Sequence, residues 1–189
     1  MLEQELLVRT VQVMDEYNIK YMLTGSYASS LQGQPRSTHD IDIVVEILMA
    51  QVPYLIAAFP SPLYYLDKVS IIDAIKHKDM FNIIETDSGN KIDFWLLTDS
   101  PFDQSRFSRR YAEKFMGHSI NVSSPEDTIL AKLRWTKLSG GSAKQFQDAL
   151  GVFELQGAKL DMEYIAKWVK KLSVESIWQE LLDKAQPIA

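Results

Sequence analysis

The 189-residue sequence contains no cysteine. This absence excludes disulfide frameworks, thiolate metal sites and a cysteine nucleophile. Only three histidines are present, and because His39, His77 and His118 stand singly along the chain, a zinc site is not expected.

Long apolar runs are also lacking, since no stretch approaches the 18 or so uninterrupted apolar residues of a membrane-spanning helix. The first residues carry charges where a signal peptide would need an apolar stretch, so we expect a cytoplasmic protein without a membrane partner. The net charge of -5 argues against a generally basic protein that coats nucleic acid. With 46% apolar residues, the chain can bury an ordinary core without covalent cross-links.

The first 122 residues mix helix and strand patterns. Helical spacing of apolar residues alternates there with short β-branched, apolar segments, which predicts an α/β or α+β domain. The expected helices cover residues 2–17, 27–31 and 48–59. The expected strands cover residues 21–24, 41–45, 80–85, 91–97 and 119–122, with the third and fourth joined as an antiparallel hairpin.

After residue 122 the pattern becomes entirely helical. Four amphipathic segments are separated by Gly-rich or polar joints, and they cover residues 126–138, 143–155, 162–172 and 174–184. We therefore expect two regions, a domain of mixed helices and strands over residues 1–122 and a helical C-terminal region over residues 123–189.

Gly25 and Ser26 interrupt a short apolar strand pattern and precede a helix pattern. A strand-to-helix turn can offer backbone N–H groups, a hydroxyl and a helix N-terminus to a triphosphate, because these groups are unsatisfied and carry partial positive charge. Such a pair indicates a phosphate site only in combination with other site residues further along the chain.

Asp40 and Asp42 lie two residues apart at the start of the strand pattern over residues 41–45. Side chains alternate between the faces of a strand, so both carboxylates point the same way. Two like charges side by side favour a cation, and carboxylate oxygens select Mg²⁺ or Mn²⁺. A lone Asp-x-Asp pair is more often structural, and its combination with the upstream turn and a third carboxylate reverses that interpretation.

Asp93 supplies the third carboxylate, in the strand pattern over residues 91–97 where it alternates with Ile92 and Phe94. If this strand lies beside residues 41–45, the three aspartates can bracket two metal ions about 4 Å apart. One metal then lowers the pKa of an attacking hydroxyl, the other carries the triphosphate, and a carboxylate can serve as general base. Taken alone, Asp93 is equally well explained as a solvated edge-strand residue.

Residues 20–97 resemble the polymerase-beta nucleotidyltransferase superfamily through the order Gly-Ser, Arg-Ser-Thr, Asp-Ile-Asp-Ile-Val and Lys-Ile-Asp-Phe. They are similar to the minimal bacterial nucleotidyltransferases and to the toxin nucleotidyltransferases of abortive-infection systems. The resemblance implies a mixed sheet flanked by helices, two divalent metals, and transfer of a nucleoside monophosphate to a hydroxyl with pyrophosphate leaving. It carries over to Ser26, Asp40, Asp42 and Asp93.

Three basic residues are second candidates for binding the triphosphate, beside Gly25 and Ser26. Arg36 lies in the loop before Asp40, and a guanidinium matches phosphate oxygens bidentately. Lys132 and Lys144 lie in the helical region and can meet a β- or γ-phosphate as point charges.

Each of these candidates also has a structural alternative. Arg36 can simply be exposed in a polar loop, and Lys132 can belong to a solvated helical face. Lys144 and Asp148 have the spacing of an exposed i,i+4 pair. We expect Trp95 in the core, with the alternative that its ring lines a base pocket by stacking.

The sequence thus predicts a metal-dependent nucleotidyltransferase that uses a nucleoside triphosphate and two Mg²⁺ or Mn²⁺ ions. The acceptor hydroxyl on a protein, an RNA or a small molecule stays open. The resemblance adds a role in a toxin–antitoxin or abortive-infection system, with an antitoxin as partner. The alternatives are a catalytically silent partner-binding module and an enzyme that modifies small molecules such as aminoglycosides.

Overall fold

The computed structural model describes residues 2–35, 38 and 40–186. Its contacts gather into two compact units, and we describe each by itself. Residues 1–24 and 38–122 form what we call the strand unit, and residues 25–37 and 123–189 form the helical unit. The expectation of separate domains over residues 1–122 and 123–189 stays a prediction.

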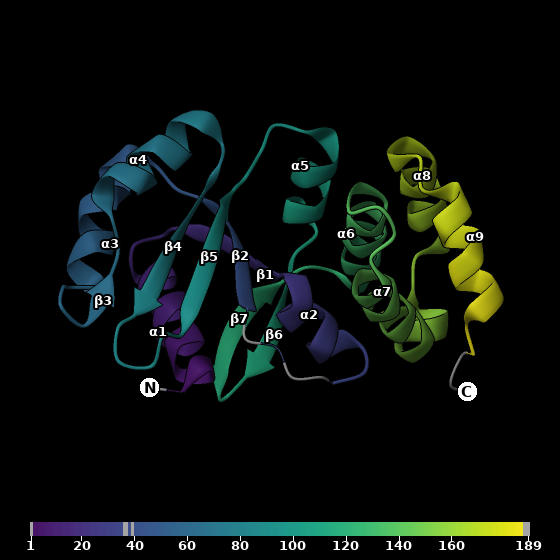
Figure 1. The fold of residues 1–189 in the computed structure, drawn as a ribbon, viewed down its shortest axis with the longest axis horizontal. Coiled ribbons are helices and arrows are strands. Elements are labelled where there is room, and N and C mark those ends of the chain that lie inside the picture. Colours follow the sequence, from purple (N-terminus) through teal and green to yellow (C-terminus); the bar gives the residue numbers. More distant parts are fainter. Residues whose placement is uncertain (1, 36–37, 39, 187–189) are drawn as a thin grey trace. The chain divides into compact units, whose positions relative to one another are not determined.

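A mixed sheet is the framework of the strand unit (Figure 1). Within the described residues it has seven strands in the order β3-β4-β5-β2-β1-β7-β6. The pairs β2–β5 and β1–β7 are parallel, and the other neighbouring pairs are antiparallel. The strands are β1 Lys20–Thr24, β2 Asp40–Glu46, β3 Tyr64–Tyr65, β4 Met80–Glu85, β5 Lys91–Leu96, β6 Tyr111–Phe115 and β7 His118–Val122.

Alternation along β2 and β5 explains which face of the sheet forms the core. Ile41 and Ile43 on β2 and Ile92 and Phe94 on β5 are all at most 1% exposed. These side chains share one face because paired residues of neighbouring strands project to the same side. The residues between them, including the aspartates, project to the opposite face.

Helix α1 contacts β1, and α3 and α4 lie beside β3 and β4 (Figure 1). Asp67 caps the beginning of α4, because its carboxylate accepts a hydrogen bond from the Ser70 backbone N–H. Lys78, in the left-handed conformation, follows the last helical residue. The helices are α1 Glu3–Glu16, α3 Val52–Ala58, α4 Lys68–His77 and α5 Pro101–Ser108, preceded at α3 by the 3-10 turn η1 Met49–Gln51.

The helical unit contains α2 and the four helices expected after residue 122, which are confirmed. Ser124, Ser142 and Asp161 each cap a helix by accepting a hydrogen bond from a backbone N–H three residues later. The helices are α2 Gly25–Gln32, α6 Pro125–Leu138, α7 Ala143–Gln156, α8 Met162–Leu172 and α9 Glu175–Lys184, with the 3-10 turn η2 Gly157–Lys159.

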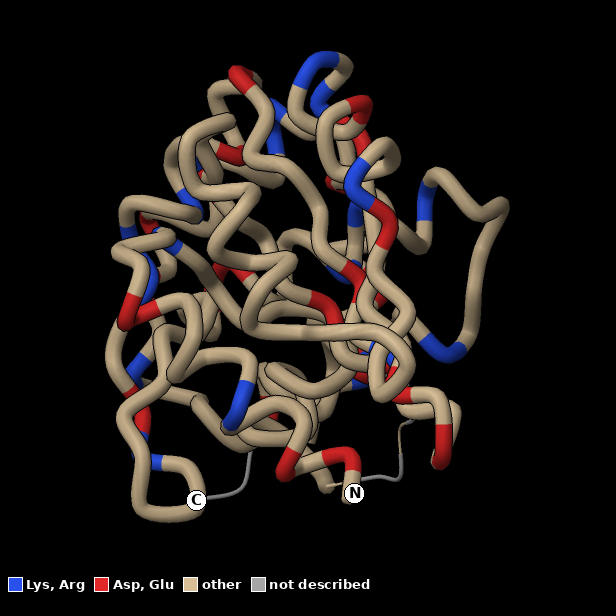
Figure 2. The backbone as a smooth tube through the Cα atoms, turned by 90° about the vertical axis from the view of Figure 1, so that its left-hand side faces the viewer, with Lys and Arg blue, Asp and Glu red and all other residues tan. Residues whose placement is uncertain are grey.

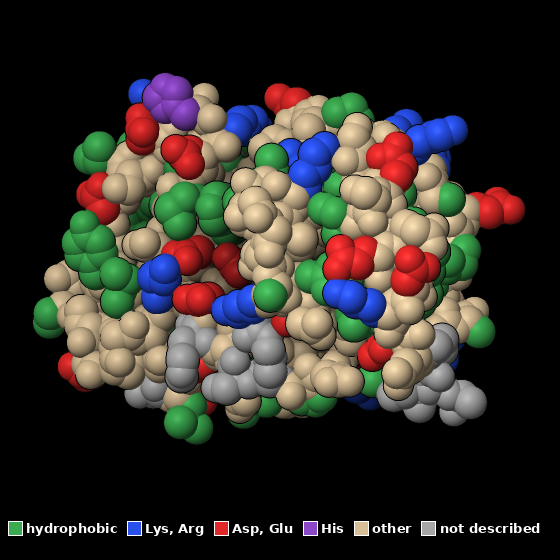
Figure 3. All heavy atoms as spheres, turned by 45° about the vertical axis from the view of Figure 1, so that its right-hand side comes forward, with side chains coloured by type: hydrophobic (Ala, Val, Ile, Leu, Met, Phe, Trp, Pro, Cys, Tyr) green, Lys and Arg blue, Asp and Glu red, His purple; other side chains and the backbone are tan. Residues whose placement is uncertain are grey.

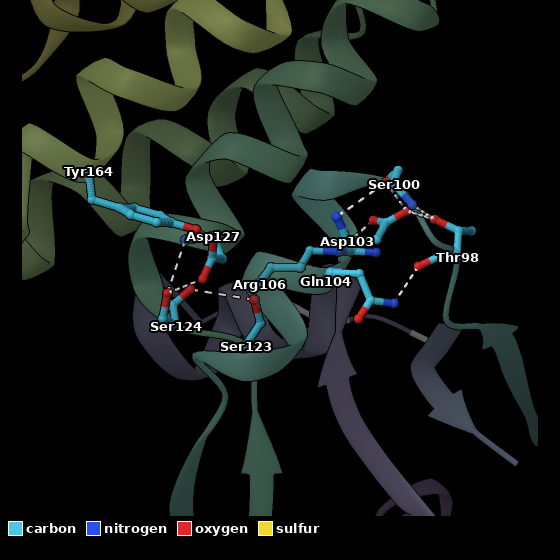
Figure 4. A network of polar contacts seen from close by, with 9 residues as sticks. All are labelled: Thr98, Ser100, Asp103, Gln104, Arg106, Ser123, Ser124, Asp127 and Tyr164. Carbon is cyan, nitrogen blue, oxygen red and sulfur yellow. Dashed lines mark hydrogen bonds and ion pairs between the residues drawn. The ribbon is translucent and has the colours of Figure 1, made fainter.

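Each unit has a polar network around a buried aspartate at a helix start (Figure 4). In the helical unit, Asp127 accepts from the Ser124 hydroxyl and from the Tyr164 hydroxyl, each at 2.7 Å. In the strand unit, Asp103 accepts from the Ser100 hydroxyl and pairs with Arg106, both at 2.9 Å. These satisfied carboxylates fix the beginnings of α6 and α5.

The expected strands and the hairpin are confirmed, but several elements were not anticipated. The elements β3, α4, α5 and β6 were not predicted, and η1 and α3 follow each other where one helix was expected over residues 48–59. Helix α5 has few regularly spaced apolar residues, and it depends on its Ser100 cap and on the burial of Phe102 and Phe107. Such stabilisation comes from tertiary packing rather than from periodicity.

Charged residues of both signs are interspersed along the described chain (Figure 2). The described part of the chain contains no helix that is long and apolar enough to cross a membrane.

Gly33 provides a stability test within the helical unit. A Cβ atom there would lie 2.8 Å from the Val152 backbone nitrogen and 2.9 Å from the Gly151 carbonyl carbon, both in α7. The backbone of α7 would have to shift to accommodate this atom. We therefore expect Gly33→Ala to lower the free energy of unfolding by about 1–3 kcal/mol, measured by chemical denaturation.

Gly151→Ala is the matched control. A Cβ atom at Gly151 would make only ordinary contact, 3.5 Å from the Gln34 backbone nitrogen. Because alanine favours a helix interior over glycine by up to about 1 kcal/mol, this variant should be neutral or more stable. Equal destabilisation by both changes would contradict the close approach at Gly33.

Candidate active site

A polar row crosses four neighbouring strands of the strand unit. Asp42 on β2 is the register partner of both Thr24 on β1 and Asp93 on β5. Asp93 is in turn paired with Asn82 on β4. Register partners project to the same face, so these four side chains lie side by side on the face opposite the apolar core.

Asp40 lies one step along the same face, since alternation separates it from Asp42 by two residues. Exposure decreases across the group, because Asp40 is exposed, Asp42 is half-buried and Asp93 is only 8% exposed. The three aspartates lie on two adjacent strands, so the pairing of residues 41–45 with residues 91–97, which the sequence left as a condition, is present.

An apolar boundary lies on the other side of Asp42. Met22 and Val44 are register partners two residues away from Thr24 and Asp42 on β1 and β2, and they cluster with Leu97 and with Phe107 of α5. Apolar packing beside the carboxylates lowers the local dielectric response, which strengthens their interaction with any cation.

Lys91 is paired with the buried aspartate. Its Nζ atom lies 2.8 Å from Oδ2 of Asp93. The hydrogen bond to Asp93 raises the pKa of Lys91, and the negative charges of Asp93, Asp40 and Asp42 act in the same direction against the effect of burial. The ammonium is therefore charged at neutral pH and partly compensates the three carboxylates.

Trp95 contacts the same group from the other end of β5. Its indole Nε1–H donates to Oδ1 of Asp42 at 3.1 Å. The expectation that Trp95 belongs to the core is wrong, since the residue is 38% exposed. The alternation of Lys91, Asp93 and Trp95 was visible in the sequence, but the direction of the indole N–H depends on its rotamer and was not.

The carboxylate oxygens of the three aspartates are suitable ligands for a divalent cation. Oδ1 of Asp93 is buried, and no hydrogen bond to it is found among the described residues. No three acidic or histidine side chains of the described segments converge as a complete metal cage. Mg²⁺ sites in nucleotide enzymes typically take one or two protein carboxylates and complete their shell with phosphates and water, so the row suits that pattern.

On the face of the molecule seen in Figure 3, one group of acidic side chains has lysine or arginine side chains at its edge. Elsewhere on that face the two signs are mixed. The mixture of the two signs on this face agrees with the small net charge of the chain.

In the helical unit, the predicted turn is held by a buried lysine. Gly25 has φ of 65°, a left-handed conformation that glycine adopts without strain where β1 passes into α2. Ser26 is 7% exposed, and its Oγ atom lies 3.4 Å from Nζ of Lys132. The same Nζ lies 2.8 Å from Oδ2 of Asp148.

Two of the structural alternatives considered for the helical unit are wrong. Lys132 is not part of a solvated face, because it is only 4% exposed. Asp148 pairs with Lys132 across α6 and α7, whereas the sequence suggested a surface pair with Lys144, which is exposed. Arg36 lies outside the described residues, and phosphate binding by Arg36 and Lys144 stays a prediction.

Comparison with solved structures relates the whole chain to one fold. The antibiotic-resistance factor ANT(2'')-Ia in solution matches with a TM-score of 0.54 at 12% identity, over 94% of this chain and 96% of that one. The same protein in complex with adenylyl-2''-tobramycin matches with a TM-score of 0.52 at 13% identity, over 92% and 98%. The chain therefore has a nucleotidyltransferase-type fold.

A third solved structure matches with a lower TM-score. An antigenic nucleotidyltransferase-like protein from Paracoccidioides brasiliensis matches with a TM-score of 0.49 at 18% identity, over 97% of this chain and 94% of that one. No protein-family model matches the chain, and no curated protein matches it in sequence. The nucleotidyltransferase-type fold is thus the extent of what the similarity establishes, and it confirms the fold class expected from the sequence.

The Lys132–Asp148 pair gives a second stability test. The two side chains are 5% and 6% exposed, so removing one leaves the other charge buried. We expect Asp148→Ala to lower the free energy of unfolding by about 3–5 kcal/mol, measured by urea denaturation.

Lys144→Ala is the control, because it removes an exposed lysine from the same helix. Its effect should stay within about 0.5 kcal/mol. If Asp148 instead belonged to a surface pair with Lys144, both substitutions would cost only a few tenths of a kcal/mol.

Proposed function

We propose that this protein is a metal-dependent nucleotidyltransferase that moves a nucleoside monophosphate from a nucleoside triphosphate to a hydroxyl group. One observation carries the proposal: β2 and β5 pair so that Asp42 lies beside Asp93, with Asp40 one step away, on the polar face of a nucleotidyltransferase-type fold. A cluster of this kind has no structural necessity, because three neighbouring carboxylates repel one another.

Asp40, Asp42 and Asp93 are the residues that would hold the divalent ions. Bound Mg²⁺ or Mn²⁺ would neutralise charge on the triphosphate and lower the pKa of the acceptor hydroxyl. The buried Oδ1 atom of Asp93, to which none of the described residues donates a hydrogen bond, supports this assignment, since a carboxylate oxygen without a hydrogen-bond donor gains most from a cation.

The chemical step needs a base and a leaving group. The acceptor oxygen forms a bond to the α-phosphorus, the bond from that phosphorus to the bridging oxygen breaks, and pyrophosphate leaves with the electron pair. A carboxylate of the three aspartates takes the hydroxyl proton.

The candidates for phosphate binding are Gly25, Ser26, Arg36, Lys132 and Lys144. Local geometry supports Ser26 and Lys132 most, because the ammonium is held in place by Asp148 and lies beside the serine hydroxyl. A buried, oriented ammonium acts as a fixed point charge toward an anion. The roles of the other three rest on the sequence alone.

The acceptor is a hydroxyl on a protein, an RNA or a small molecule. The adenylylated tobramycin in the ANT(2'')-Ia complex makes aminoglycosides a reasonable first panel of small-molecule acceptors. A role in a toxin–antitoxin or abortive-infection system, with an antitoxin partner, rests on the sequence resemblance.

Label transfer tests the proposal. The purified protein is incubated with Mg²⁺, each α-³²P-labelled ribonucleoside triphosphate, and either cell extract or an aminoglycoside panel. We expect transfer of label to an acceptor, a loss of about a thousandfold in Asp42→Asn, and loss on chelation with EDTA.

Asp87→Asn is the matched control, because it removes an exposed carboxylate from the β4–β5 turn. This variant should transfer label at the wild-type rate. Undiminished transfer by Asp42→Asn would reject the assigned metal site. Absence of triphosphate binding at millimolar concentration, measured by calorimetry with Mg²⁺, would favour the catalytically silent module instead.

A further inference from the structure

Trp95 does not belong to the core, to the three carboxylates or to the predicted phosphate contacts, yet it touches the site. We propose that Trp95 is a positioning residue whose indole N–H orients the carboxylate of Asp42 for metal binding. This inference rests on the proposed function, because it assigns a task that matters only if Asp42 is a metal ligand.

The strand register explains how the indole reaches Asp42. Trp95 lies two residues beyond Asp93 on the same face of β5, and its own partner on β2 is Val44. Asp42 is therefore its diagonal neighbour, a spacing that a long aromatic side chain can bridge. The indole Nε1–H points at Oδ1 of Asp42 over 3.1 Å.

The direction of this hydrogen bond suits a residue that positions a metal ligand. Indole N–H is a donor only, so it can hold a carboxylate without competing as a ligand for the metal. A hydrogen bond to one carboxylate oxygen restricts the torsion of the side chain and thus the direction of its lone pairs. Such outer partners of metal ligands commonly change metal affinity 10- to 100-fold.

The exposure of the ring also needs a reason. Trp95 is 38% exposed on a strand whose neighbours Phe94 and Leu96 are buried, so burial does not explain its size. Two functions are then open to the side chain, stacking on a base through the ring or positioning Asp42 through the N–H. The substitution Trp95→Phe separates them, because it retains an aromatic ring and removes the N–H donor.

Binding of Mn²⁺ alone, followed by electron paramagnetic resonance, provides a measurement that is independent of turnover. We expect Asp42→Asn to abolish tight binding and Trp95→Phe to raise the Kd for Mn²⁺ about tenfold. Trp135→Phe is the matched control, since it removes another exposed indole, 52% exposed and located on α6, and it should bind as the wild type does.

A second measurement uses the unmodified side chain. In ¹⁵N-labelled wild-type protein, the indole N–H resonance of Trp95 should shift when Mg²⁺ is added, and that response should vanish in Asp42→Asn. The resonance of Trp135 should not respond in either protein.

The outcomes separate the two proposals. If wild type binds Mn²⁺ and Trp95→Phe binds equally well, the positioning role is wrong while the proposed function stands. An unchanged Kd for Mn²⁺ combined with a weaker Kd for ATP in Trp95→Leu, but not in Trp95→Phe, assigns the ring to base stacking. If wild type itself fails to bind Mn²⁺, both the metal site and the role of Trp95 are overturned.

Discussion

The in-register pairing of β2 with β5 is the interaction on which the strand unit and its candidate site both depend. It buries Ile41, Ile43, Ile92 and Phe94 on one face, and by the same alternation it lines up the carboxylates on the other. A slip of one residue would turn the apolar set toward the polar face. The hydrophobic core therefore fixes the position of Asp93 beside Asp42.

This arrangement concentrates negative charge at partly buried positions, where a charge has a high desolvation free energy. The protein compensates locally, because the ammonium of Lys91 pairs with Asp93 and the indole of Trp95 donates to Asp42. Both compensating groups come from β5, at the alternate positions on either side of Asp93. One strand thus supplies a carboxylate, its counter-charge and a hydrogen-bond donor, so the register that places one places all three.

Much of this could be predicted from the sequence, because alternation along a strand is a local property. The common face of Asp40 and Asp42 and the hairpin that presents Asp93 follow from a period of two. Long-range pairing does not follow in this way. Lys132 and Asp148 meet across the joint between α6 and α7, whereas the i,i+4 rule singled out Lys144 because that rule considers only one helix. Helix α5 was missed because packing, not periodicity, stabilises it.

The burial of Lys132 alters how the Gly-Ser turn should be understood. A lysine on a solvated face would reach a phosphate only by giving up rotamer freedom, at a cost of about 2 kcal/mol in entropy. Here Asp148 and Ser26 already orient the ammonium. The far end of α2 is also secured, since Gln32 donates to the Ser123 carbonyl and accepts from Gln156. Both ends of α2 are therefore fixed within the helical unit. An anion bound at the Gly-Ser turn would meet a preorganised site, so its binding would carry little entropic cost for ordering the side chains.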